Sequence, residues 1–176
     1  MGSLLTAFQS SLSRIFIILT LLFLSVSCDQ ISKNIARERL SKNETVQLLN
    51  KHLTLVKVEN TGAFLSIGTE LPQPYKFILL TCLPVIVLLI ALGYLLFQSS
   101  LSRLSTLGVS LFIGGGIGNL YDRLLYGSVT DFLHLDFVLF ETGIFNVADI
   151  CITTGVLLLL IGMIREAQAP TRLQEL

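Results

Sequence analysis

Two aspartates, Asp131 and Asp149, stand in sequence surroundings that suit acid–base chemistry. Asp131 lies in the mainly apolar stretch 129–133, and Asp149 lies near the start of a long apolar run. Neither has a lysine or arginine within four residues along the chain. Two carboxyl groups in a poorly hydrated site cannot both ionise, so one retains a proton while the other accepts one from water. Such a pair can act as general acid and general base in the hydrolysis of an amide.

Other ways of activating water or an amide have less support in the sequence. The three cysteines and two histidines have no metal-ligand spacing, and there is no His-Glu-x-x-His motif. These residues are Cys28, Cys82, Cys151, His52 and His134. Ser32 and Lys33 are adjacent, so on a helix their side chains point roughly 100° apart, which disfavours a serine–lysine pair. The sequence therefore predicts neither a metal nor another cofactor.

Further polar or small residues form four short clusters that could support the two aspartates. They are Asp29, Lys33, Asn60, Gly62, Asn119, Asp122, Arg123, Asn146 and Ala148. Each cluster also has a purely structural interpretation, in chain order an ion pair, a loop corner, a helix C-cap and a helix N-cap. The structural and the functional interpretation both stay open for each cluster taken alone.

The composition is that of an integral membrane protein. The 176 residues are 52% hydrophobic and only 14% charged, with a mean hydropathy of +0.76, whereas soluble domains carry roughly 25% charged residues. A carboxylate inside a span costs roughly 2.5–3.5 kcal/mol, so each one needs a partner or a function. The net charge is zero, which gives no basic field for nucleic acid.

Four apolar blocks predict four transmembrane helices in one domain covering residues 1–176. The expected spans are 13–33, 76–98, 101–121 and 144–165, and the long loops 35–74 and 122–145 share one side of the membrane. All the polar clusters lie in these loops or at the helix ends next to them. Lysine and arginine counts favour the cytoplasm for the long loops, but acids nearly cancel them, so charge leaves the orientation open.

The loops have strand-like patterns of their own. Residues 46–49 and 53–59 have strand composition around a turn-like Asn50-Lys51, and apolar residues alternate along 133–139. The first pattern predicts a small sheet on the membrane surface and the second an extended membrane-lying segment, whereas Asp131 is expected in a loop. The predicted fold class is an all-α membrane protein, a four-transmembrane-helix bundle with a small β-rich cradle and a short extended second loop.

Five ordered motifs together resemble those of lipoprotein signal peptidase, the bacterial signal peptidase II family. They are Asp29-Gln30-x-Ser32-Lys33, Asn60-Thr61-Gly62-Ala63-Phe64, Gly118-Asn119-Leu120-x-Asp122-Arg123, Val129-x-Asp131-Phe132 and Phe145-Asn146-Val147-Ala148-Asp149. The resemblance covers nearly all of residues 15–164. Each motif is weak by itself, and their order, the chain length and the four-span layout make the combination specific.

The resemblance implies a monomeric aspartic endopeptidase of the bacterial cytoplasmic (inner) membrane, with both termini in the cytoplasm and both loops, including the β-rich cradle, extracytoplasmic. Its substrate would be a diacylglyceryl-modified prolipoprotein in membrane lipid, cut just before the lipidated cysteine. The family's catalytic aspartates align with Asp131 and Asp149, and its other site residues align with the nine supporting residues named above. The segment from Phe64 to Ile67 would cover the site from water, and Arg123 would support the structure near Asp122.

Two rival functions predict different arrangements of the acids. A proton-coupled carrier or channel subunit would spread carboxylates through the bilayer depth. A structural subunit would use Asn146 and Asp149 only to cap a helix. A third possibility, that residues 25–28 end a lipoprotein signal peptide, is disfavoured by the three further spans.

Overall fold

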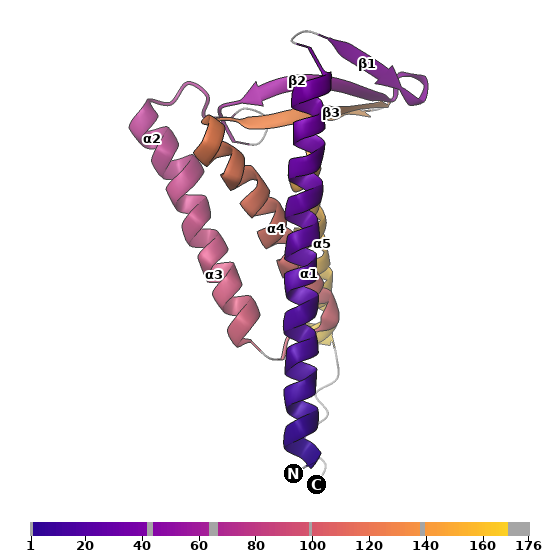
Figure 1. The fold of residues 1–176 in the computed structure, drawn as a ribbon, viewed down its shortest axis with the longest axis vertical. Coiled ribbons are helices and arrows are strands. Elements are labelled where there is room, and N and C mark those ends of the chain that lie inside the picture. The colour runs from indigo at the N-terminus through magenta and orange to yellow at the C-terminus, as the bar shows by residue number, and fades with distance from the viewer. Residues whose placement is uncertain (1, 42–43, 64–66, 99, 138–139, 169–176) are drawn as a thin grey trace.

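A computed structural model describes residues 2–41, 44–63, 67–98, 100–137 and 140–168. Its helices and strands follow one another along the chain in the order α1, β1, β2, α2, α3, α4, β3, β4 and α5 (Figure 1). The long helices are α1 Gly2–Arg39, α3 Leu83–Phe97, α4 Arg103–Tyr126 and α5 Val147–Gln168. Helix α2, Gln73–Phe77, continues into α3 through the π-helical segment η3, Ile78–Cys82.

Among the described residues, four helical segments are long and apolar enough to cross a membrane. They are Leu12–Arg39, Gln73–Phe97, Arg103–Tyr126 and Val147–Gln168. The first continues to Arg39, six residues beyond the expected end at residue 33. Its last turns remain helical because Lys33 and Ala36 lie fully or almost fully buried against the rest of the protein. The sheet lies at one end of these helices, and α1 begins and α5 ends at the other (Figure 1).

Helix α4 packs against α1, α3 and α5 through glycines on three of its sides. A β-carbon at Gly114 would lie 2.6 Å from Ser25 of α1, and one at Gly116 would lie 2.5 Å from Leu88 of α3. On the α5 side, a β-carbon at Gly108 would lie 2.7 Å from the carbonyl oxygen of Gly155. Small residues let helix backbones approach closely in a membrane, which explains a glycine content that would weaken an isolated helix.

A four-stranded antiparallel sheet has the order β1-β2-β3-β4. Its strands are β1 Thr45–Leu48, β2 Leu53–Asn60, β3 Val129–Phe137 and β4 Phe140–Glu141, with the turn η1, Leu49–Lys51, between the first two. The hairpin expected around Asn50-Lys51 is therefore present. The expectation of a loop at Asp131 was wrong, since this residue lies in β3 opposite Val58 of β2. The term all-α in the predicted fold class is too narrow, although the small β-rich part predicted with it is present as this sheet.

The sheet is attached to the bundle through its apolar residues and a tight turn. Ala36 of α1 and Leu40, the residue after this helix, form a buried cluster with Phe132 of β3, and partly buried Val46, Leu55, Leu133 and Val147 pack against it. Gly127 ends α4 in the left-handed conformation, with φ of 70°, that glycine adopts without steric cost. Strand β3 begins two residues later, so Asp131 lies close to the end of α4.

Candidate active site

Asp131 lies in a central strand of the sheet, and its side chain is buried. Asn60 donates a hydrogen bond from Nδ2 to one carboxylate oxygen at 2.9 Å, and Asn146 donates to the other at 2.6 Å. Burial raises the pKa of Asp131 from 3.8 to about 6, opposed by these two hydrogen bonds and reinforced by the charge of Asp149. Asp131 can therefore exchange a proton close to neutral pH.

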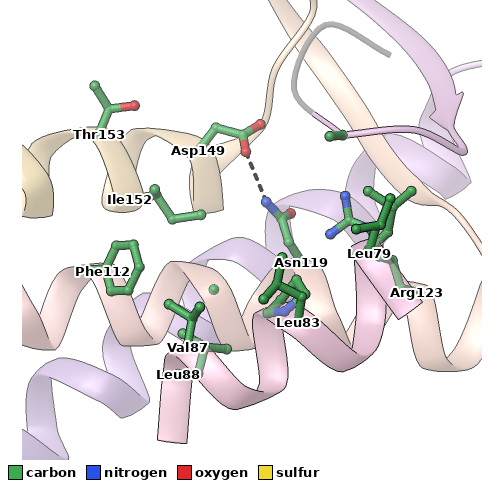
Figure 2. A pocket seen from close by; sticks show the side chains of 14 residues that line it. Leu79, Leu83, Val87, Leu88, Phe112, Asn119, Arg123, Asp149, Ile152 and Thr153 are labelled. Atoms are coloured by element: carbon green, nitrogen blue, oxygen red, sulfur yellow. Dashed lines mark hydrogen bonds between the residues drawn. The ribbon is translucent and has the colours of Figure 1, made fainter. Parts of the chain in front are cut away.

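Asp149 lies in the first turn of α5, where it forms a reciprocal cap with Asn146. The backbone N–H of Asn146 donates to Asp149 Oδ2 at 3.1 Å, and the backbone N–H of Asp149 donates to Asn146 Oδ1 at 3.0 Å. The other carboxylate oxygen, Oδ1, accepts a hydrogen bond of 2.9 Å from Asn119 Nδ2, which Figure 2 shows pointing toward Asp149. Capping the helix and facing a cavity are thus compatible roles for one side chain.

Asparagine side chains connect the two carboxylates. Asn146 Nδ2, which donates to Asp131, also lies 3.2 Å from Asn119 Oδ1. The same Asn119 oxygen accepts a hydrogen bond of 2.8 Å from Lys33 Nζ. With its oxygen occupied by two donors, Asn119 must direct its Nδ2 group toward Asp149. Both carboxylates line one small cavity, so the fold brings together the two residues that the sequence nominates for acid–base chemistry.

Asp29, Lys33 and Asp122 form a fully buried ion cluster, which Lys33 connects to Asn119 of this cavity. Lys33 Nζ lies 2.8 Å from Asp29 and 3.3 Å from Asp122, and Arg37 pairs with Asp122 at 2.8 Å. Two acids and two bases balance in charge, which a buried cluster requires. The backbone N–H of Ala148 donates to Asp29 at 2.9 Å and so connects α1 to the first turn of α5.

Arg123 contacts the turn that follows β2. Its Nη2 donates a hydrogen bond of 3.0 Å to the carbonyl oxygen of Gly62. Within that turn, Asn60 Oδ1 accepts from the backbone N–H of Gly62 at 2.9 Å, and Asn60 Nδ2 donates to the Ala63 carbonyl at 3.1 Å. Arg123 therefore fastens the turn carrying Asn60 to α4. Asp122 points elsewhere, because neighbouring side chains on a helix diverge by roughly 100°.

A larger, mainly apolar cavity of about 540 Å³ is lined at one place by Asp149 (Figure 2). Leu83 and Val87 of α3, Phe112 of α4 and Ile152 of α5 form part of its wall. Its polar lining residues are Asn119, Arg123, Asp149 and Thr153. A long apolar group in this space would therefore end beside Asp149. Within the described ranges, no group of three or more histidine, cysteine, aspartate or glutamate side chains is arranged to bind a metal.

Comparison with known families agrees with these features. A model of the family described as signal peptidase (SPase) II matches residues 21–165. The chain belongs to the signal peptidase II family. Members of this family are aspartic peptidases, which agrees with two aspartates that line one cavity. The four long apolar helices agree with a multi-pass bacterial membrane protein.

Individual relatives of this signal peptidase II cover most of the chain. The lipoprotein signal peptidase of Streptococcus pneumoniae is 35% identical over 150 residues, which are 85% of this chain and 94% of that protein. The one from Lactiplantibacillus plantarum is 36% identical over 151 residues, 86% and 96% of the two chains. The one from Aquifex aeolicus is 36% identical over 134 residues, 76% and 77% of the two chains.

Two solved structures of bacterial membrane enzymes share the fold. One has a TM-score of 0.80 at 23% sequence identity and covers 92% of this chain and 96% of its own. The other has a TM-score of 0.75 at 24% identity and covers 86% and 95% of the two chains. The combination of membrane helices and a small antiparallel sheet is therefore that of known membrane enzymes.

All eleven residues nominated from the sequence lie in one connected region of this signal peptidase II, at the sheet end of the helices. Sequence reasoning missed Arg37 and Gln30, which both contact Asp122. The spacing of Asp29, Lys33 and Arg37, four residues apart, was the available signal, since it places all three on one helix face. Phe64, expected to cover the site, lies outside the described residues.

Proposed function

We propose that this signal peptidase II removes the signal peptide from diacylglyceryl-modified prolipoproteins, cutting just before the lipidated cysteine, with Asp131 and Asp149 as its catalytic residues. Its relatives are named lipoprotein signal peptidases. The observation that carries the proposal is the shared amide network, in which Asn146 contacts both Asp131 and Asn119, and Asn119 contacts Asp149. Two carboxylates of one cavity are thereby given fixed orientations, which acid–base catalysis needs.

The reaction follows from the chemistry of such a pair. The ionised carboxylate takes a proton from water, whose oxygen forms a bond to the carbonyl carbon of the scissile peptide. The protonated carboxyl group gives its proton to the carbonyl oxygen, producing a tetrahedral diol. The carboxyl group that took a proton from water then gives it to the nitrogen, while the other carboxylate takes a proton from a diol hydroxyl. The C–N bond breaks, leaving a new carboxyl group, a new amine and the aspartate pair in its starting protonation state. The raised pKa of Asp131 makes proton exchange possible near neutral pH.

The supporting residues have roles that match their contacts. Asn60, Asn119 and Asn146 orient the carboxylates, and Lys33 orients Asn119. Asp29, Asp122 and Ala148 connect α1, α4 and α5 around the site, whereas Arg123 positions the turn at Gly62. The apolar cavity of about 540 Å³ is suited to the apolar part of a signal peptide.

The placement of the site also supports a membrane orientation. We assign both termini to the cytoplasm and the sheet to the extracytoplasmic surface, where an exported prolipoprotein presents its cleavage site. Residues 1–176 act as one membrane domain, because the sheet and the helices share the cluster around Phe132. One chain supplies both aspartates and their amide partners, which is consistent with a monomer in membrane lipid.

A carrier or channel subunit is less consistent with the arrangement of acids. Among the described residues, the buried acids are Asp29, Asp122 and Asp131, and all three contact the network at the sheet end. A proton pathway through the bilayer would need titratable groups at successive depths. The clustering at one end favours a surface-level reaction over transport.

Cleavage of a purified diacylglyceryl-prolipoprotein by the purified protein tests the proposal. We expect Asp131→Asn and Asp149→Asn each to lower the rate about 10²–10⁴-fold, because each removes a proton-transfer group. Asp136→Asn is the matched control, since Asp136 is exposed on the same strand as Asp131, and it should cleave at the wild-type rate. Wild-type inactivity, or full activity of either active-site variant, would refute the proposal.

A further inference from the structure

Strand β2 contains an irregularity shortly before it reaches the active site. Leu55 of β2 pairs with Leu133 of β3. The next pair in the register is Val58 with Asp131, so two residues of β2 lie opposite a single residue of β3. This arrangement is a β-bulge, which changes the direction of the side chains that follow it. After the bulge the two strands share only three residue pairs, so few backbone hydrogen bonds hold this end of the sheet.

The bulge decides which face of the sheet Asn60 occupies. Alternate residues of a strand share a face, so in a regular strand Glu59 would follow Leu55 onto the face of Asp131. Asn60 would then point away from the active site. With the bulge, Asn60 lies on the face of Asp131 and donates to it at 2.9 Å, whereas Glu59 points to the opposite face. A slip of one residue would therefore replace the amide donor beside Asp131 by a third carboxylate.

Two hydroxyl groups hold Glu59 on the opposite face. Glu59 pairs with Thr130 in the register, and Thr130 Oγ1 donates to Glu59 Oε1 at 3.0 Å. Ser128 Oγ donates to the other carboxylate oxygen, Oε2, at 2.6 Å. Thr130 is fully buried and Ser128 nearly so, and hydrogen bonds to a carboxylate are stronger than those between neutral groups. These bonds therefore favour the pairing that keeps Glu59 away from Asp131.

Arg37 of α1 supports the same threonine from a second side. Its Nε donates to Thr130 Oγ1 at 2.9 Å, so this hydroxyl accepts from a cation while it donates to an anion. The guanidinium also pairs with Asp122 at 2.8 Å and lies over the Tyr126 ring, 4.2 Å from its centroid. The backbone N–H of Thr130 donates to Asp122 at 3.1 Å. Residues of α1, α4 and β2 thus hold the residue that directly precedes Asp131.

We infer that Arg37, Thr130 and Glu59 form a register clamp, which selects the bulged pairing of β2 with β3 and thereby positions Asn60 against Asp131. This role rests on the proposed function, in which Asp131 exchanges a proton with water and substrate. Thr130 is a positioning residue, because its side chain points away from the active site and reaches the reaction only through Asn60 and Asp131.

Thr130→Val tests the register clamp, because valine has a similar shape and a strong preference for strands but no hydroxyl group. Thr130→Ser restores the hydroxyl, and Thr54→Val is the matched control at a threonine of β2 that lies opposite His134. Each variant is assayed for kcat and KM with a diacylglyceryl-prolipoprotein across a range of pH. Hydrogen exchange of the backbone amides of residues 58–60 reports the strand pairing without any cleavage.

We expect Thr130→Val to lower kcat about 10–100-fold with nearly unchanged KM, because a small displacement of a catalytic group has a large effect on rate. The hydrogen bond from Asn60 lowers the pKa of Asp131, so its loss should move the corresponding limb of the pH profile to higher pH. Exchange at residues 58–60 should rise about tenfold or more, while exchange at residues 53–55 should stay unchanged. Thr130→Ser and Thr54→Val should retain the wild-type values.

Wild-type kcat, pH profile and exchange in Thr130→Val would overturn the inference. So would a lower melting temperature with unchanged kcat and pH profile, which is a purely structural effect, or an equally large loss in Thr130→Ser. If Thr130→Val does not fold, Ser128→Ala removes one hydroxyl from Glu59 and should shift kcat and the pH profile in the same directions; wild-type behaviour would again overturn the inference. If the wild type does not cleave, the proposed function fails, and the exchange data alone decide whether the register clamp exists.

Discussion

Replacing Lys33 by methionine tests whether the buried ion cluster organises the active site. The side chains of Lys33, Asp29 and Asp122 have no exposed surface, and Lys33 Nζ lies 2.8 Å and 3.3 Å from the two carboxylates. Lys33→Met leaves two buried acids facing one base, Arg37. Breaking a buried pair in this way costs about 3–5 kcal/mol of folding free energy. The measurement is the free energy of unfolding in detergent micelles, compared with that of Lys51→Met at an exposed lysine.

A compensating variant separates charge balance from active-site geometry. Adding Asp29→Asn to Lys33→Met restores equal numbers of acids and bases, so the double variant should recover much of the lost stability. It should still cleave about 10–100-fold more slowly than wild type, because Asn119 has lost the donor that directs its amide toward Asp149. A loss below about 1 kcal/mol in Lys33→Met would show that the cluster is not desolvated as described.

Two further perturbations have predictable signs. The raised pKa of Asp131 means that its ionisation opposes folding. The wild type should therefore lose up to about 3 kcal/mol of folding free energy between pH 4 and pH 7, and Asp131→Asn should lose less. Identical pH profiles of the unfolding free energy for the two proteins would contradict this. Gly118→Ala would place a methyl group against the carboxylate of Asp29 and should lower the free energy of unfolding by about 1–3 kcal/mol. The control is Gly93→Ala, where a β-carbon would have nothing within 4 Å, and it should be neutral or slightly stabilising. Equal melting temperatures for the two variants would contradict this expectation.

Local pattern was sufficient to predict the helices and the first hairpin. Apolar runs predicted four long helices, and alternation around Asn50-Lys51 predicted β1 and β2, because both features depend on residues close in sequence. The capping relation between Asn146 and Asp149 was equally local and is present.

Long-range pairing was not predictable in the same way. Strand β3 pairs with β2 across about 70 residues of chain, as in Val58 with Asp131, and no local signal specifies that register. Asp131 was consequently expected in a loop. Helix α1 continues to Arg39, beyond the expected span, and there Arg37 contacts Asp122 and Thr130, which lie far away in the sequence.

The central claim is that Asp131 and Asp149 act as one catalytic unit, and a double-mutant comparison of cleavage rates tests it most directly. We predict that the double variant Asp131→Asn with Asp149→Asn cleaves a diacylglyceryl-prolipoprotein no more slowly than either single variant. If the two residues act as one unit, either substitution alone already removes its catalytic effect, so the second substitution costs no further rate. Losses that multiply in the double variant, or a single variant with the wild-type rate, would contradict the claim.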